Sequence, residues 1–187
     1  MQPTRFLAAA VAALLLAACA TPSMAPPAPS GLPGQYSVSG RIGVNAAGKG
    51  YSASFSWAHA QDVDRVDVSN PLGQVVARLE LEPGGARYYD SAGKARSADD
   101  VETLSERELG WRLPAYGLRY WLLGLADPSR PAQWRREVDE RVLEQDGWSI
   151  RFRGTTAGAP ERLTLSRPDL EVRIVLSDWQ FDTPSTQ

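Results

Sequence analysis

Histidine and cysteine are nearly absent from this chain of 187 residues, which contains one of each, His59 and Cys19. A metal site built from histidine and cysteine needs several of these ligands, so we expect no such site. A serine–histidine–aspartate triad would have to use His59. Because His59 follows a predicted strand, we interpret it as a solvated loop residue. A single cysteine also leaves no partner for an internal disulfide.

The chain also lacks the signatures of nucleotide and nucleic-acid chemistry. The pair Gly84-Gly85 stands in a predicted turn and not in a phosphate-binding loop. The formal net charge of −2 argues against an electrostatic nucleic-acid binder. No pair of carboxylates stands out as a hydrolase site, and Glu102, Glu106 and Glu108 indicate a solvated helix face. We therefore expect no enzyme activity, cofactor, metal or nucleic-acid partner.

The N-terminal segment has the layout of an export signal. Arg5 precedes an apolar run, Phe6 to Ala18, that is too short to span a bilayer as a helix. Leu16-Ala17-Ala18-Cys19 then resembles the lipobox of bacterial lipoproteins, in which the cysteine becomes the lipidated first residue. A plain secretory signal with a chance cysteine is the alternative. Ala20 favours the outer membrane, since many Gram-negative bacteria retain lipoproteins with aspartate there in the inner membrane.

The segment after the cysteine is rich in proline and free of charge. Residues 20–34 contain five prolines, which indicates a semi-extended tether. We therefore divide the chain into a signal peptide (1–18), a lipidated N-terminus with its tether (19–34) and one domain (35–187).

Period-two alternation dominates the domain and predicts antiparallel strands. The clearest case is 51–57, where aromatic and alanine residues alternate with three serines. Asp146-Gly147 adds a strong hairpin signal. By the same pattern we expect strands at 36–44, 51–57, 66–68, 75–81, 86–89, around 95, and at 141–145, 148–153, 163–165 and 172–176.

The pattern changes in the middle of the chain. Ser97-Ala98-Asp99-Asp100 resembles a capping box and predicts a helix that ends near Gly110. A second short helix is expected from Pro114 to Leu123. The order of strands, two helices and strands shows no βαβ alternation. It predicts a mainly β fold, a curled antiparallel sheet with helices covering one side.

Aromatic residues are numerous, with six tryptophans, six tyrosines and four phenylalanines. Many of them fall on inward strand faces or in the second predicted helix. They either fill a solid core or line an apolar cavity between a half-closed sheet and its helices. Periodicity does not separate these two arrangements.

The turn Asn70-Pro71-Leu72-Gly73 places a leucine at its tip, where water is the expected neighbour. Pro71 and Gly73 make the turn stiff. Leu72 either folds back onto the sheet or points outward to an apolar partner.

Several motifs together resemble the LolB family of outer-membrane lipoprotein receptors, and their order and spacing span nearly the whole domain. They are the lipobox cysteine, Phe55-Ser56-Trp57, Asn70-Pro71-Leu72-Gly73, Ala98-Asp99-Asp100, Leu118-Arg119-Tyr120-Trp121-Leu122-Leu123-Gly124-Leu125, Gln145-Asp146-Gly147-Trp148 and a final strand ending in Trp179. Arg41 and Gly43 depart from the apolar first strand that family members often have.

The resemblance implies an incomplete, half-open antiparallel β-barrel with a helical lid over a hydrophobic cavity. It implies a monomeric receptor, lipid-anchored at the outer membrane and facing the periplasm. Such a receptor accepts lipoproteins from the periplasmic carrier LolA and inserts them among outer-membrane phospholipids without nucleotide hydrolysis. The alternative is a structural or assembly lipoprotein with a solid aromatic core and an external binding surface.

The resemblance also implies roles for particular residues. Cys19 carries the lipid, and Leu72, held by Pro71 and Gly73, enters the membrane. Our candidates for the lining of the acyl-chain cavity are Phe55, Trp57, Leu79, Trp121, Leu122, Leu125, Trp148, Ile150 and Phe152.

Overall fold

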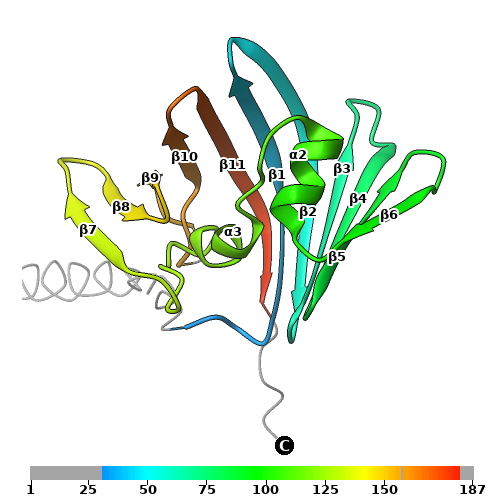
Figure 1. The fold of residues 1–187 in the computed structure, drawn as a ribbon. Helices are drawn as coiled ribbons and strands as arrows, with labels where there is room; N and C mark the ends of the chain where they lie inside the picture. The colour runs from blue at the N-terminus through cyan, green and yellow to red at the C-terminus, as the bar shows by residue number, and fades with distance from the viewer. Residues whose placement is uncertain (1–30, 157, 182–187) are drawn as a thin grey trace, which may run out of the picture.

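The computed structural model describes residues 31–156 and 158–181 and contains one antiparallel sheet of eleven strands. The strand order is β6-β5-β4-β3-β2-β1-β11-β10-β9-β8-β7. Two short helices lie on one face of this sheet (Figure 1). Within the described residues the end strands β6 and β7 do not pair, so the sheet is open. The predicted fold, mainly β and half-open with a helical cover, is confirmed.

The elements follow one another as antiparallel neighbours along the chain. The first six strands are β1 (Gln35–Ala46), β2 (Lys49–Ala60), β3 (Val63–Ser69), β4 (Val75–Glu82), β5 (Gly85–Asp90) and β6 (Ala95–Ala98). The helices α2 (Val101–Leu109) and α3 (Ala115–Trp121) come next. The last strands are β7 (Ala132–Arg136), β8 (Arg141–Gln145), β9 (Trp148–Arg153), β10 (Arg162–Arg167) and β11 (Leu170–Phe181). Strand β11 returns to pair with β1, which joins the two halves of the sheet.

The N-terminal predictions fall outside the described part of the chain. The signal peptide (1–18), Cys19 and residues 20–30 of the tether are not among the described residues. In the described ranges, no helix has the length and apolar character needed to cross a membrane.

The first helix begins later than its capping signal predicts. Strand β6 continues to Ala98, and Asp100 is the residue that caps α2. Its carboxylate accepts hydrogen bonds from the backbone N–H of Glu102 (3.3 Å) and of Thr103 (2.8 Å). Gly110 ends the helix with a left-handed backbone, φ 80°. The prediction of a cap at Ser97 was therefore wrong, because strand pairing with β5 takes Ser97 and Ala98 first.

Strand β7 was not predicted. All five of its residues are exposed, so they show no apolar alternation. It is held by pairing with β8 and by Trp134, whose ring lies 5.7 Å from that of Phe152 and against the guanidinium of Arg141 (5.3 Å). An edge strand without a buried face leaves no periodic signal in the sequence.

The core lies on the concave face of the sheet, beneath the helices. In β9 the side chains of Trp148, Ile150 and Phe152 are buried. In β11 the buried side chains of Val172 and Ile174 are separated by exposed Arg173. Side chains that alternate along a strand point to opposite faces, so each strand gives the core one row.

Gly40 in β1 makes room for an aromatic ring of the neighbouring strand. It pairs with Phe55 of β2, and a Cβ atom at position 40 would lie 2.9 Å from the Phe55 ring. The same atom would lie only 2.2 Å from the carbonyl oxygen of Val175. Gly43, three residues further along β1, has as its nearest such contact the carbonyl oxygen of Tyr51, at 3.9 Å.

We predict that Gly40→Ala lowers the free energy of unfolding by about 1–3 kcal/mol, because the added methyl forces the backbone and Phe55 apart. Gly43→Ala is the matched control in the same strand and should change stability by no more than about 0.5 kcal/mol. Urea unfolding followed by tryptophan fluorescence measures both. Equal stability of the two variants would show that β1 accommodates a side chain at position 40.

Candidate functional site

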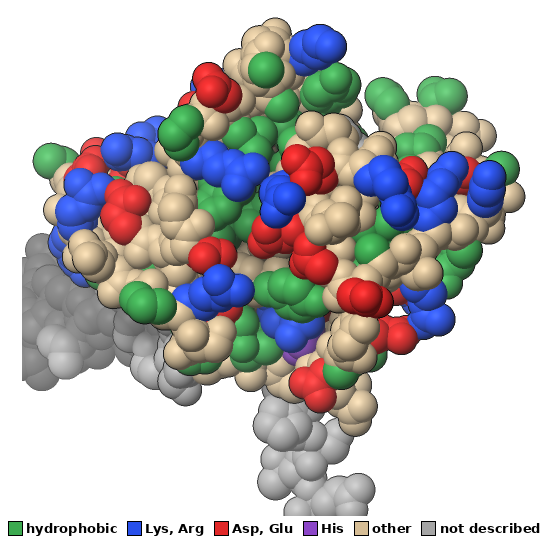
Figure 2. Space-filling view, in the orientation of Figure 1, with side chains coloured by type: hydrophobic (Ala, Val, Ile, Leu, Met, Phe, Trp, Pro, Cys, Tyr) green, Lys and Arg blue, Asp and Glu red, His purple; other side chains and the backbone are tan. Residues whose placement is uncertain are grey.

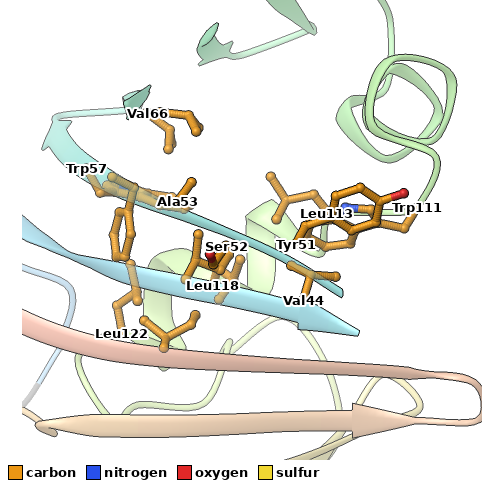
Figure 3. A pocket seen from close by; sticks show the side chains of 14 residues that line it. Val44, Tyr51, Ser52, Ala53, Trp57, Val66, Trp111, Leu113, Leu118 and Leu122 are labelled. Carbon is orange, nitrogen blue, oxygen red and sulfur yellow. The ribbon is translucent and has the colours of Figure 1, made fainter. Parts of the chain in front are cut away.

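An apolar cavity of about 210 Å³ lies between the concave face of the sheet and the helices. Figure 3 shows its wall from close by. Of the lining residues only Ser52 has neither an apolar nor an aromatic side chain, and none carries a charge. The wall is formed by Ile42, Val44, Tyr51, Ser52, Ala53, Phe55, Trp57, Val66, Val68, Trp111, Leu113, Leu118, Leu122 and Ile174.

The cavity has a buried end and an exposed end. In Figure 3, Trp57 and Leu122 lie at one end, and Val44, Tyr51 and Trp111 lie at the other. Trp57 and Leu122 are buried, whereas Tyr51 is 56% exposed. Val44 and Tyr51 pair with each other shortly before the β1–β2 turn. The mouth therefore faces the edge of the sheet where this turn lies.

The structure brings three of the nine predicted lining residues to the cavity, namely Phe55, Trp57 and Leu122. The other six do not line it. Leu79 is buried in β4, Leu125 is half-buried against the core, and Trp121, Trp148, Ile150 and Phe152 are buried beneath the β8–β10 half of the sheet.

Packing explains why the four residues beneath β8–β10 lie elsewhere. The rings of Trp121 and Trp148 lie 6.4 Å apart, and the indole N–H of Trp121 donates to the Gln145 side chain at 2.8 Å. This half of the concave face is filled by its own aromatic side chains. The cavity opens instead under β1, β2 and β3.

Sequence reasoning missed most of the wall. Ile42, Val44, Val66, Val68 and Ile174 continue strand alternations, which mark the concave face but not its uncovered part. Trp111 and Leu113 lie in the connection between the helices. Large apolar residues in so short a connection are a signal that could have identified them.

A fully buried carboxylate fastens α3 to the sheet. Asp64 in β3 is 0% exposed. Its carboxylate accepts hydrogen bonds from the Trp57 indole N–H (2.9 Å) and from Nε of Arg119 in α3 (2.7 Å). A second guanidinium nitrogen of Arg119 completes the ion pair. Because Trp57 also lines the cavity and Leu118 and Leu122 flank Arg119, this network fixes the wall on both sides.

His59 belongs to the same network, which corrects its interpretation as a solvated loop residue. It is 2% exposed, at the inner face of β2, and its Nδ1 lies 2.8 Å from the Asp64 carboxylate. We assign a hydrogen to Nδ1, since a carboxylate paired with arginine only accepts. Tyr36 stacks on the imidazole with ring centroids 5.2 Å apart and donates from its hydroxyl to the Arg119 carbonyl at 2.8 Å. Burial, reinforced by the Asp64 charge, raises the pKa of Tyr36 well above its usual value, so the phenol stays protonated.

The β3–β4 turn holds Leu72 outward. The Asn70 side-chain oxygen accepts from the backbone N–H of Leu72 (2.9 Å) and of Gln74 (3.1 Å). The N–H of Gly73, which has a left-handed backbone (φ 81°), donates to the Asn70 carbonyl at 2.9 Å. The Leu72 side chain is 84% exposed.

The same edge of the sheet carries the cavity mouth and this leucine. Ser54 pairs with Ser69, so the β3–β4 turn lies level with the strand end that carries Tyr51. Figure 1 places the β1–β2, β3–β4 and β5–β6 turns along one edge, and Figure 2 shows hydrophobic side chains above β3 and β4. We call these three turns the Leu72 edge.

Comparison with known proteins places the chain in a family. Residues 34–179 match the family described as outer membrane lipoprotein LolB. The chain belongs to the LolB family. An outer-membrane lipoprotein LolB of Chromobacterium violaceum is 39% identical over 174 residues, which cover 90% of this chain and 94% of that protein. The protein of the same name from Thiobacillus denitrificans is 37% identical over 172 residues, 88% of this chain and 91% of that protein. The resemblance predicted from the motifs is confirmed.

Among solved structures, a LolA superfamily protein from Nitrosomonas europaea superimposes with a TM-score of 0.49 at 9% identity. The superposition covers 80% of this chain and 87% of that chain.

In the described ranges of this LolB-family chain, no group of three or more histidine, cysteine or acidic side chains is placed to hold a metal ion.

We predict that Arg119→Met destabilises the domain by about 3–5 kcal/mol, because the buried Asp64 charge loses its partner. Arg65→Met is the control, since the neighbouring Arg65 pairs with Glu80 at 3.1 Å on the surface and should contribute no more than about 1 kcal/mol. Urea unfolding measures both. A loss for Arg119→Met as small as that of the control would contradict a structural role for the buried pair.

Proposed function

We propose that this chain is an outer-membrane lipoprotein receptor that accepts lipoproteins from the periplasmic carrier LolA and inserts them into the outer membrane. The cavity is the observation that carries the proposal. It is apolar, free of charge and open at one edge, as a site for acyl chains needs to be. The lipid on Cys19 would anchor the domain with this edge available to the membrane, on the periplasmic side.

A site for acyl chains needs an apolar binding surface and no catalytic group. Three chains of roughly 16 carbons contribute on the order of 30–40 kcal/mol of membrane affinity at about 0.8 kcal/mol per methylene, so such cargo cannot cross water unaided. A cargo moves between sites only by differential affinity. Transfer from carrier to receptor to bilayer then needs no nucleotide hydrolysis, provided that each step is downhill.

The cavity volume indicates that the helical cover moves during this transfer. Sites for small ligands begin at about 300 Å³, whereas this cavity measures about 210 Å³. On this proposal, a cavity of this volume would have to enlarge to accept acyl chains. Lipid would enter as the α2–α3 connection, which carries Trp111 and Leu113, shifts away from β1 and β2, while the Arg119–Asp64 pair holds α3 in place.

The exposed leucine supports the membrane step. Burial of one leucine is worth about 1.5–3 kcal/mol, which is too little to anchor a domain but enough to bias a cavity mouth toward the bilayer. Leu72 stands on the edge that carries the mouth, so contact with lipid would bring the two together. A structural lipoprotein with a solid core has no need of this arrangement.

We predict that Ala53→Phe closes the cavity without unfolding the domain. Ala53 lines the cavity, and a larger side chain there would occupy the space of a ligand. Fluorescence titration with N-phenyl-1-naphthylamine should show at least about tenfold weaker binding than the parent, equivalent to about 1.4 kcal/mol. Ala58→Phe, on the exposed face of the same strand, is the control and should bind the probe normally. Unchanged binding by Ala53→Phe would place the apolar site elsewhere.

We predict that Leu72→Glu keeps stability within about 0.5 kcal/mol and still receives lipoprotein from LolA, but releases it into liposomes at least about tenfold more slowly. The reason is that a carboxylate cannot enter the bilayer as leucine does. Val138→Glu, which changes an almost fully exposed side chain (98%) in the β7–β8 turn, should transfer normally. Loss of both steps by Leu72→Glu, or a stability loss of several kcal/mol, would make Leu72 a packing residue.

A further inference from the structure

The chain contains only two lysines, and both lie on the Leu72 edge. Lys49 begins β2 directly after the β1–β2 turn, in which Ala47 and Gly48 have left-handed backbones. Lys94 ends the β5–β6 turn and directly precedes β6. The β3–β4 turn with Leu72 lies between these two turns in the sheet order. Neighbouring turns are two strand spacings apart, or about 10 Å.

The β5–β6 turn repeats the geometry of the β3–β4 turn. The Asp90 carboxylate accepts from the backbone N–H of Ala92 (3.0 Å) and of Lys94 (2.9 Å), as the Asn70 side chain does in its own turn. The N–H of Gly93 donates to the Asp90 carbonyl at 2.8 Å. Lys94 therefore occupies the position that Gln74 has beside Leu72. The turn fixes the Lys94 backbone on the same edge.

The two lysine ammonium groups are available to an external partner. Both side chains are exposed, and among the described residues neither forms an ion pair with a carboxylate. In the described structure, none of the acidic side chains near these turns forms an ion pair with Lys49 or Lys94. Asp90 holds its turn and lies 3.6 Å from Arg96, and Asp67 pairs with Arg78. Asp169 stands in the β10–β11 turn beside the β1–β2 turn, where its carbonyl accepts from the Ala47 N–H at 3.0 Å, and its carboxylate forms no ion pair with Lys49.

We propose that the Leu72 edge recognises anionic phospholipid, with Lys49 and Lys94 contacting headgroup phosphates while Leu72 enters the acyl region. This proposal rests on the membrane step of the proposed function and names the lipid that the edge selects. Exposed Leu72, Val75 and Val76 stand between the two cations. A bilayer with anionic lipid offers phosphates above an apolar layer, so it matches both features. Because the chain as a whole is net negative, such a preference must come from a local patch.

The size of the effect follows from the number of lysines. A basic residue at an anionic membrane surface contributes about 1 kcal/mol, or about a fivefold change in affinity. Loss of both lysines should therefore weaken binding to anionic vesicles by about 25-fold. Raising the salt concentration should weaken the parent in the same direction, because charges on an exposed surface are screened.

The test uses the exported chain, residues 19–187 with Cys19→Ser, so that the lipid anchor does not hold every variant on the vesicle. Co-sedimentation is measured with vesicles of phosphatidylcholine alone and of phosphatidylcholine with phosphatidylglycerol. We expect the parent to prefer the phosphatidylglycerol vesicles and Lys49→Gln/Lys94→Gln to lose this preference. Arg41→Gln/Arg162→Gln removes the same charge from exposed positions in β1 and at the start of β10 that make no ion pair with a described residue, and should keep the preference. Thermal unfolding checks that both double variants remain folded.

The proposal is overturned if the lysine variant retains the preference or if the arginine control loses it equally, because the Leu72 edge is then not the lipid contact. Normal vesicle binding with failed handover from LolA would instead assign the lysines to carrier docking. The proposed function fails separately. If the parent prefers phosphatidylglycerol vesicles but releases lipoprotein into neither vesicle type, only the receptor role is refuted. If the parent binds both vesicle types equally and releases lipoprotein into both, only the lipid selection is refuted.

Discussion

The apolar face of the sheet is wider than the helices that cover it, and the cavity follows from this mismatch. Eleven strands at about 4.8 Å spacing span on the order of 50 Å before curling. Helices α2 and α3, of nine and seven residues, are about 14 Å and 11 Å long at 1.5 Å per residue. Two such helices cannot cover the whole face. Aromatic side chains, with Trp121 of α3 among them, fill the space beneath β8–β10, whereas beneath β1–β3 the smaller Ala53, Val66 and Val68 leave the space that forms the cavity.

The buried ion pair decides where the helices stop. An apolar contact alone would let α3 slide until it filled the cavity, because hydrophobic attraction has no direction. The Arg119 guanidinium must instead meet the Asp64 carboxylate, and the Tyr36 hydroxyl must meet the carbonyl of the same arginine. These contacts hold Leu118 and Leu122 on the helical side of the cavity and keep them from packing directly against β1 and β2. The cost of burying a charge is thus offset by three hydrogen bonds to the Asp64 carboxylate and by its ion pair with Arg119, and the result is a fixed gap.

The sequence predicted the faces of the sheet but not how much of each face is covered. Phe55 and Trp148 stand in strands with the same alternation, yet Phe55 lines the cavity and Trp148 packs against Trp121. The difference depends on where α3 lies, which requires the long-range contact between Arg119 and Asp64. His59 shows a signal that could have been used, because it continues the alternation of Phe55 and Trp57 for one more step. Strand β7 left no such signal, and Leu72 could be placed outward only through the family resemblance.

A small cavity gives the proposed transfer its direction. Acyl carbons that do not fit within about 210 Å³ stay in contact with water or with the rim until the cover opens further. Each methylene that moves from such a position into the bilayer gains about 0.8 kcal/mol. A larger, perfectly fitting cavity would retain its cargo, since release requires the membrane to bind better than the receptor. The turn with Leu72 would shorten the path of this proposed transfer, because it would bring the cavity mouth against lipid before the chains leave the wall. In the proposed transfer, incomplete burial of the cargo would therefore make the site a point of passage rather than a store.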